Sequence, residues 1–136
     1  MPTAKQHRAA AARHLRAYRA TVNKHPDWGA VMLFYAALHL LESAFDKIGI
    51  HNTTHSKREL FIKSSAVHSG IWPAYHRLET ESMKTRYLQG GSFCMNAKAV
   101  DSELRRGKLA EVRRHVRAVL HPRVVMKLAG AKPVRQ

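Results

Sequence analysis

The amino-acid sequence predicts an all-α protein, an antiparallel bundle of four to five helices. Ala, Leu, Arg, Lys and Glu dominate the long segments, and these residues are strong helix formers. Apolar residues recur at intervals of three and four, whereas no stretch alternates cleanly with the period of two that marks a strand. Gly and Pro separate the periodic segments, and the short connections between them favour antiparallel neighbours.

Two long helices are expected in the first third of the chain. The first spans residues 3–22, and Pro26 separates it from the second, which spans residues 28–48 with Asp27 as its N-cap. The second helix is apolar on nearly every side, so we expect it to form the buried centre of the bundle. It is short for a membrane span and contains Glu42, so no membrane association is expected.

Further helices are expected beyond Gly49, separated by Gly70 and by the turn at Gly90-Gly91-Ser92. They run from a cap at Thr54 or Ser56 to about residue 67, from 71 to 88, and from 97 to 120.

The length of 136 residues suits one domain. Residues 1–121 are expected to form this single bundle, and residues 122–136 a basic C-terminal tail.

The charge balance is the most unusual feature of the composition. Lys and Arg number 24 against 9 Asp and Glu, which gives a formal net charge of +15. Such an excess destabilises the compact state by self-repulsion and is typical of proteins that meet a polyanion. We therefore expect RNA, or DNA, as the partner, although an acidic protein would satisfy the same electrostatics. The last helix is the most one-sided, and its predicted nucleic-acid-binding residues are Arg105, Arg106, Lys108, Arg113 and Arg117.

Cysteine usage and the absence of familiar motifs narrow the chemistry. Cys94 is the only cysteine, which excludes an intrachain disulfide and, with no apolar segment near the N-terminus, favours a cytoplasmic location. The sequence has no nucleotide-binding glycine motif, no cysteine pair for zinc and no carboxylate cluster for magnesium, so no metal or cofactor is expected. His51 and His55, four residues apart, would bind a metal only on a helix, and the sequence around Asn52 predicts a loop.

Several short motifs follow one another in a suggestive order. The segment from Phe34 to His39 contains an aromatic-Ala-X-X-His pattern, Tyr35 to His39, in an apolar helix. His55-Ser56-Lys57-Arg58 opens the next helix, and Thr85-Arg86-Tyr87 ends the one after. This series resembles the compact prokaryotic branch of the HEPN superfamily, over residues 27–87 with a fourth-helix match at 97–120. The resemblance implies a helical bundle that forms a homodimer and binds RNA or nucleotides.

The resemblance also implies an activity. Many members of this superfamily are metal-independent ribonucleases with an Arg-X4-6-His motif, in which the Arg holds the scissile phosphate and the His assists proton transfer. Where that motif aligns, this chain has Ser82 and Tyr87 in place of the Arg and the His. A matching spacing occurs between Arg114 and His121, on the last helix, which makes these two residues candidate catalytic residues.

A second candidate catalytic site lies at helix ends. His55 and Arg58 begin one expected helix, and Arg86 and Tyr87 end another. Antiparallel packing across the connection at 67–71 is expected to bring these ends together. A histidine beside two guanidinium groups would form a phosphate pocket with a proton carrier. Alternatively, the Arg and Tyr simply cap a helix C-terminus.

Three interpretations of function follow. The first is an RNA-binding HEPN-like protein with metal-independent endoribonuclease activity, in a toxin, defence or RNA-processing system. The second is a non-catalytic nucleic-acid-binding or accessory protein that kept the bundle without the chemistry. The third is a basic module that docks on an acidic protein partner, such as an antitoxin or a nucleotidyltransferase. A salt titration separates the third from the others, since phosphate contacts make affinity fall steeply with salt.

Overall fold

Eight helical segments make up the secondary structure of residues 1–122, the part of the chain that the computed structural model describes. In chain order they are α1 (Ala4–Thr21), α2 (Pro26–Asp46), α3 (His55–Ser64), η1 (Ser69–Ile71), α4 (Trp72–Tyr87), α5 (Ala97–Ala99), η2 (Val100–Leu109) and α6 (Ala110–Leu120). No strand occurs in this part of the chain, and the all-α prediction is confirmed. The expected basic tail, beyond its first residue Pro122, lies outside the described residues.

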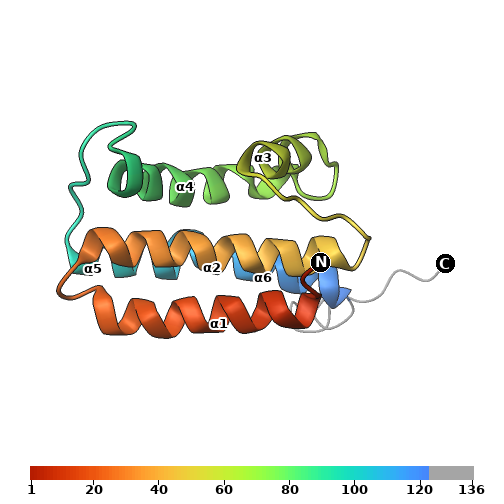
Figure 1. Ribbon diagram of the computed structural model, residues 1–136, viewed down its shortest axis with the longest axis horizontal. Helices are drawn as coiled ribbons and strands as arrows, with labels where there is room; N and C mark the ends of the chain where they lie inside the picture. The colour runs from red at the N-terminus through yellow and green to blue at the C-terminus, as the bar shows by residue number, and fades with distance from the viewer. Residues whose placement is uncertain (123–136) are drawn as a thin grey trace.

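Four long rods form the bundle, namely α1, α2, α4 and the continuous run α5–η2–α6 (Figure 1). Rods that follow one another along the chain run in opposite directions, as the antiparallel prediction requires. The helix α3 is the exception, because it lies crosswise to the rods and is seen nearly end-on in Figure 1. α2 occupies the centre and contacts α1, α4, η2 and α6.

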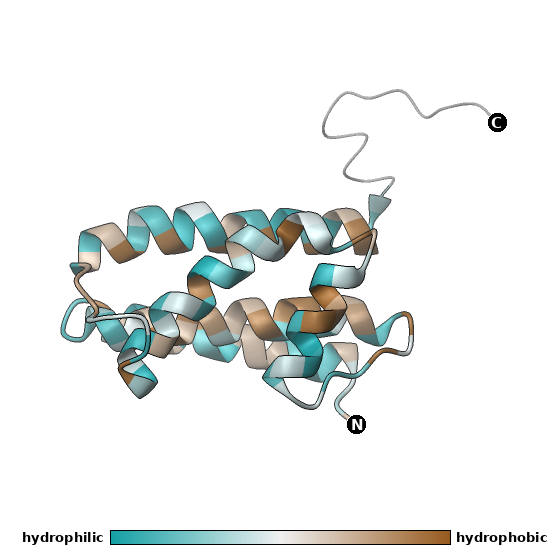
Figure 2. Cartoon of the chain, turned by 90° about the horizontal axis from the view of Figure 1, so that it is seen from above, coloured by the Kyte–Doolittle hydropathy of each residue, from teal (hydrophilic) through white to brown (hydrophobic). Residues whose placement is uncertain are grey.

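α2 is central because little of its surface is polar. Phe34, Leu41 and Phe45 are completely buried, and each contributes about 1.5–3 kcal/mol by leaving water. By length and composition α2 could cross a membrane, yet 72% of its apolar window is buried inside the bundle. This degree of burial is typical of the core helix of a soluble protein. Figure 2 shows that hydrophilic residues cover much of the outer side of the surrounding helices.

The start of α2 differs from the prediction. Asp27 is not the N-cap, because the helix begins at Pro26 with His25 in the capping position. Proline suits the first helical position, since the N–H that it lacks would be unsatisfied there in any case. Asp27 lies in the first turn, where its carboxylate accepts a hydrogen bond from the Trp28 N–H at 2.9 Å and faces the positive end of the helix dipole.

α3 is shorter than expected, ending at Ser64 rather than near residue 67. The Ser64 hydroxyl donates to a carbonyl of the preceding turn at 2.7 Å, a local bond that competes with continued helix. The loop that follows α3 contacts α6 through a histidine pair. Nδ1 of the buried His68 lies at hydrogen-bond distance, 2.7 Å, from Nε2 of His115. Of the two expected caps, Thr54 is the one used.

The last helix is continuous from Ala97 to Leu120, as predicted, but its middle section η2 is wound as a π-helix. Val100, Leu104 and Leu109 are buried there, at spacings of four and five residues. A spacing of five does not fit the α-helical period, whereas it matches the i to i+5 bonding of a π-helix. The π winding therefore keeps all three apolar side chains on the core side.

Candidate functional site

Arg58 lies in the first turn of α3, and its side chain is buried against α2. Its Nε donates to Oε1 of Glu42 on α2 at 2.7 Å, and the two side chains are only 7% and 3% exposed. One terminal nitrogen donates to the carbonyl of Asn52 at 3.0 Å, and the other lies 3.3 Å from Nδ1 of His55. The charge of Arg58 is thus compensated inside the protein, and its side chain joins α3 and the preceding loop to α2.

The contact with Arg58 fixes the tautomer of His55. A guanidinium can only donate, so Nδ1 of His55 accepts and the ring proton lies on Nε2. Burial, together with the positive charges of Arg58 and Arg86, lowers the pKa of His55. The ring is therefore neutral at physiological pH and carries a donor at Nε2. Such a group suits holding an anion better than accepting a proton.

Arg86, in the last turn of α4, has hydroxyl partners instead of a carboxylate. Its Nε donates to the hydroxyl of Ser82 at 2.8 Å. One terminal nitrogen donates to the hydroxyls of Tyr35 at 2.8 Å and Tyr87 at 3.3 Å. No acidic side chain among residues 1–122 forms an ion pair with Arg86, and its charge acts on the carboxyl of Glu79 only at longer range, so the guanidinium is held in place without a direct acidic partner.

Aromatic rings surround the same guanidinium. Its central carbon lies 5.4 Å from the ring centroid of Phe34, 5.2 Å from that of Tyr35 and 4.9 Å from that of Tyr87. Contacts of this kind attract a cation through the ring quadrupole. The ring of His55 lies 5.9 Å from Phe34. The histidine and Arg86 therefore meet at one phenyl ring of the central helix.

A row of histidines extends from Tyr35 between α1 and α2. The ring of His14 stacks on Tyr35 and on His39, at centroid distances of 5.7 and 5.5 Å, and Nδ1 of His39 lies 3.0 Å from Nδ1 of His7. Burial lowers the pKa of His39 to about 4, with neighbouring cationic groups acting in the same direction. Within the described chain no group of three His, Cys, Asp or Glu side chains is arranged to hold a metal. The row is an uncharged extension of the site.

Four of the predicted catalytic residues lie near one another. His55 contacts Arg58, and Tyr87 contacts Arg86, with Phe34 between the two pairs. The predicted packing was wrong, however, because α3 lies crosswise to α4 instead of packing antiparallel to it (Figure 1). The helix ends meet because both contact the central helix.

The other two predicted catalytic residues, Arg114 and His121, lie apart from this cluster. Both are exposed, on α6 and at its C-cap, and neither side chain has a hydrogen-bond or ion-pair partner among residues 1–122. The intervening His115 is engaged with His68 in the bundle. Their assignment as an Arg-X-His motif stays a prediction.

The predicted nucleic-acid-binding residues of the last helix fall into two groups. Arg105 and Arg106 both pair with Asp101, and Lys108 lies 3.8 Å from a glutamate one turn on. These three charges are partly compensated. The members that are exposed and form no ion pair with a described residue are Arg113 and Arg117.

Sequence reasoning missed three residues of the site, namely Tyr35, Glu42 and Ser82. Tyr35 belongs to the apolar helix expected at the buried centre, yet it is half-buried and its hydroxyl faces Arg86. A signal existed for Glu42, since a single carboxylate inside an apolar helix requires a cationic partner. Nothing in the sequence distinguishes Ser82 from other serines.

Comparison with known proteins adds no relative to this description. No family model matches the chain, and neither a characterised protein nor a solved structure matches it significantly. The functional interpretation therefore depends on the residues described above.

Proposed function

We propose that this protein binds RNA, and that Arg86, with His55 beside it, holds a phosphate of the RNA backbone. The observation that carries the proposal is the surroundings of Arg86. Three hydroxyls and three aromatic rings fix its guanidinium, while no described carboxylate forms an ion pair with it. A pre-positioned guanidinium is well suited to phosphate, which it binds through paired N–H groups.

Exposed aromatic side chains beside Arg86 favour RNA over a free anion. Tyr87 is 57% exposed and Trp28 is 47% exposed. The hydroxyl of Thr85 donates to the carbonyl of Asp27 at 3.4 Å, so the start of α2, with Trp28, lies against the last turn of α4. Unpaired bases of single-stranded RNA stack on such rings while the backbone meets cationic groups.

The tautomer of His55 favours binding without cleavage. Its Nδ1 lone pair is occupied by Arg58, so the ring cannot take a proton from a ribose hydroxyl in this arrangement. The proposal is therefore the second interpretation above, a bundle that binds nucleic acid without cutting it. The order of motifs supports a HEPN-like homodimer. This family and this oligomeric state are therefore part of the proposal.

Binding of a fluorescently labelled, unstructured RNA to wild type and Arg86→Gln tests the proposal. Loss of one desolvated phosphate contact is expected to weaken binding roughly tenfold or more, and Arg86→Lys should recover part of the loss. The matched control is Arg77→Gln, also on α4, whose guanidinium is paired with Glu81 and Glu103. It should bind nearly as wild type does. Equal affinities of wild type and Arg86→Gln would overturn the proposed site.

The same samples test for catalysis and for a protein partner. Incubation of the RNA in EDTA is expected to leave it intact. Metal-independent cleavage that is lost in His55→Gln would replace the binding proposal by the ribonuclease one. Binding of RNA that fails altogether, or that does not weaken with salt, would favour the acidic-protein interpretation.

A further inference from the structure

α1 is a helix without a single acidic residue, and four of its five Lys and Arg residues form a stripe. These four residues are exposed, and their spacing along the chain places them on one side of the helix. They are Lys5, Arg8, Arg16 and Arg19. None of them forms an ion pair with a described residue. The exposed Ala12 lies on the same side of the helix, between Arg8 and Arg16. The buried side of the helix, with Ala11, Leu15 and Tyr18, packs on the bundle.

The stripe lies on the side of α1 that faces the last helix. A groove of about 610 Å³ separates the two, and its lining includes Arg19 and Asn23 from the α1 side and Lys98 and Arg105 from the other. The hydroxyl of Tyr18 donates to Asp101 across it at 2.8 Å. Helical spacing then puts the rest of the stripe along the same edge.

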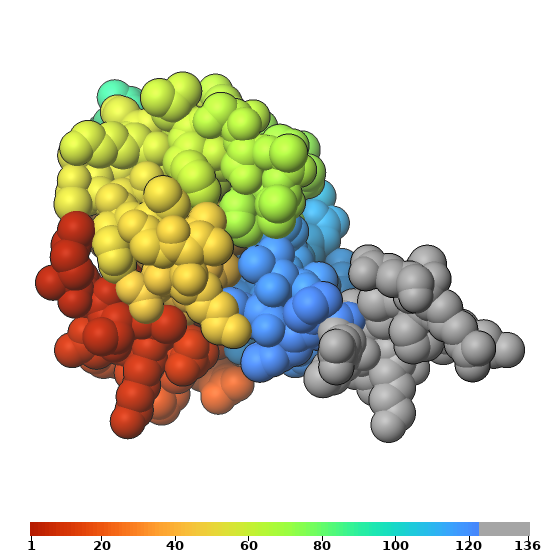
Figure 3. Space-filling model, turned by 90° about the vertical axis from the view of Figure 1, so that its right-hand side faces the viewer, coloured from red at the N-terminus to blue at the C-terminus, as the bar shows by residue number. Residues whose placement is uncertain are grey.

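Arg113 and Arg117 continue the basic surface on α6. They lie four residues apart and are exposed, whereas the adjacent His115 turns to His68 in the loop before α4. Figure 3, an end view, shows α1 and α6 together on the side of the molecule opposite α3. We call the surface made by Lys5, Arg8, Arg16, Arg19, Arg113 and Arg117 the α1–α6 basic face.

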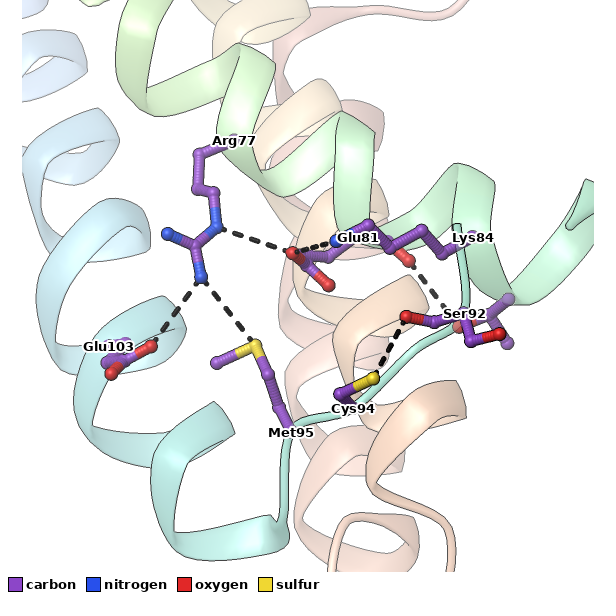
Figure 4. A network of polar contacts seen from close by, with 8 residues as sticks. Arg77, Glu81, Lys84, Ser92, Cys94, Met95 and Glu103 are labelled. Atoms are coloured by element: carbon purple, nitrogen blue, oxygen red, sulfur yellow. Dashed lines mark hydrogen bonds and ion pairs between the residues drawn. The ribbon is translucent and has the colours of Figure 1, made fainter. Parts of the chain in front are cut away.

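Two of the nine acidic residues form a group of ion pairs at a different seam. Between α4 and η2, Glu81 pairs with Arg77 and Lys84, and Arg77 also reaches Glu103 (Figure 4). On the groove side the only acidic residue that lines it is Asp101. Hydrogen bonds, chiefly from Arg105, lower the pKa of Asp101 to about 2. Arg105, Arg106 and the Tyr18 hydroxyl occupy this carboxylate, which forms no ion pair with a residue of the basic face.

We propose that the α1–α6 basic face binds the sugar-phosphate backbone of a nucleic acid, as a second contact surface separate from Arg86. This second proposal rests on the proposed function, because the basic face and the Arg86 site both require a nucleic-acid partner. From Lys5 to Arg19 the stripe is about 21 Å long at 1.5 Å per residue, enough to follow several phosphates. Uncompensated arginines in two rows are complementary to a regularly spaced polyanion.

The test measures affinity against salt for Arg8→Gln/Arg19→Gln, with Lys5→Gln/Arg16→Gln as a second variant of the same stripe. Two probes are used, a 20-base-pair RNA duplex and an unstructured RNA of 20 nucleotides. For the strand form that uses the face, the slope of log affinity against log salt is expected to fall by about two, with roughly tenfold to hundredfold weaker binding at low salt. The matched control is Arg13→Gln/Lys47→Gln, which removes two exposed charges elsewhere.

The outcomes separate this proposal from the Arg86 site. Unchanged slopes in both stripe variants, with wild-type binding intact, would overturn the basic face alone. Weaker binding by the stripe variants but not by Arg86→Gln would support the face and overturn the Arg86 site. No binding of either probe by the wild type would overturn both. A stripe variant that matches the control in affinity and slope also counts against the proposal.

Discussion

Arg58 and Arg86 occupy comparable places, the first turn of α3 and the last turn of α4, yet their partners differ in kind. Arg58 is 7% exposed and bonded to the carboxylate of Glu42 at 2.7 Å. Arg86 is half-buried and bonded to hydroxyls at similar distances. The first arginine is an internal structural cation, whereas the second keeps its charge available.

The comparison shows why a cluster of basic residues is not in itself a binding site. Both arginines belonged to one predicted site, but Arg58 forms an ion pair with a carboxylate and Arg86 does not. Arg58 instead acts on the site through His55, whose ring it orients. The two arginines thus differ in whether a carboxylate or neutral hydroxyls hold the guanidinium.

The largest expected effect is on stability, from Arg58→Met. This change leaves the buried carboxylate of Glu42 unpaired, which should lower the free energy of unfolding by about 3–5 kcal/mol. Urea denaturation measures it. The double variant Glu42→Leu/Arg58→Met removes both charges and should recover most of the loss. A single variant that loses under about 1 kcal/mol would contradict the structural role.

Arg86→Gln should affect stability less. It removes hydrogen bonds to partly exposed hydroxyls and the contacts with the rings, together about 1–2 kcal/mol. The same urea experiment compares it with Arg58→Met under identical conditions. Equal losses in the two variants would erase the distinction between the arginines.

The smallest effect is a change in the titration of His55. Since its folded-state pKa is lowered by burial and by both arginines, the folded state binds fewer protons than the unfolded one just below pH 6.5. Its contribution to stability is therefore lost as pH falls through that window. In Arg86→Gln the pKa should rise toward its ordinary value, as NMR of the ring protons would show. Arg77→Gln, a charge removed elsewhere on α4, should leave the titration of His55 unmoved.

Periodicity predicted the long helices well, because each is defined by residues close in sequence. The rods α1, α2, α4 and the last helix end within about two residues of the expected positions. The orientation of α3 could not be predicted in this way. Its apolar side is short, with Ile62 buried, and the pattern does not say which neighbour receives it.

The proximity of four predicted residues could be anticipated from the sequence, whereas their arrangement and three of their partners could not. His55, Arg58, Arg86 and Tyr87 were identified from the order of motifs, and each lies near the others. What joins them is Phe34, a core residue of α2 that carries no chemical signal of its own. The tautomer of the histidine likewise depends on a long-range contact, from Arg58 to Glu42, that no local spacing reveals.

The π winding of η2 has a consequence for which changes in chain length the bundle tolerates. Removing one residue from an ordinary α-helix turns everything before it by about 100° and exposes its apolar side. Here, deleting Gly107 would reduce the spacing between Leu104 and Leu109 from five to four, the value an α-helix prefers. Val100 and Leu104 would still face the core, with the segment rewound as an α-helix. The π winding thus accommodates one residue beyond the α-helical spacing between Leu104 and Leu109.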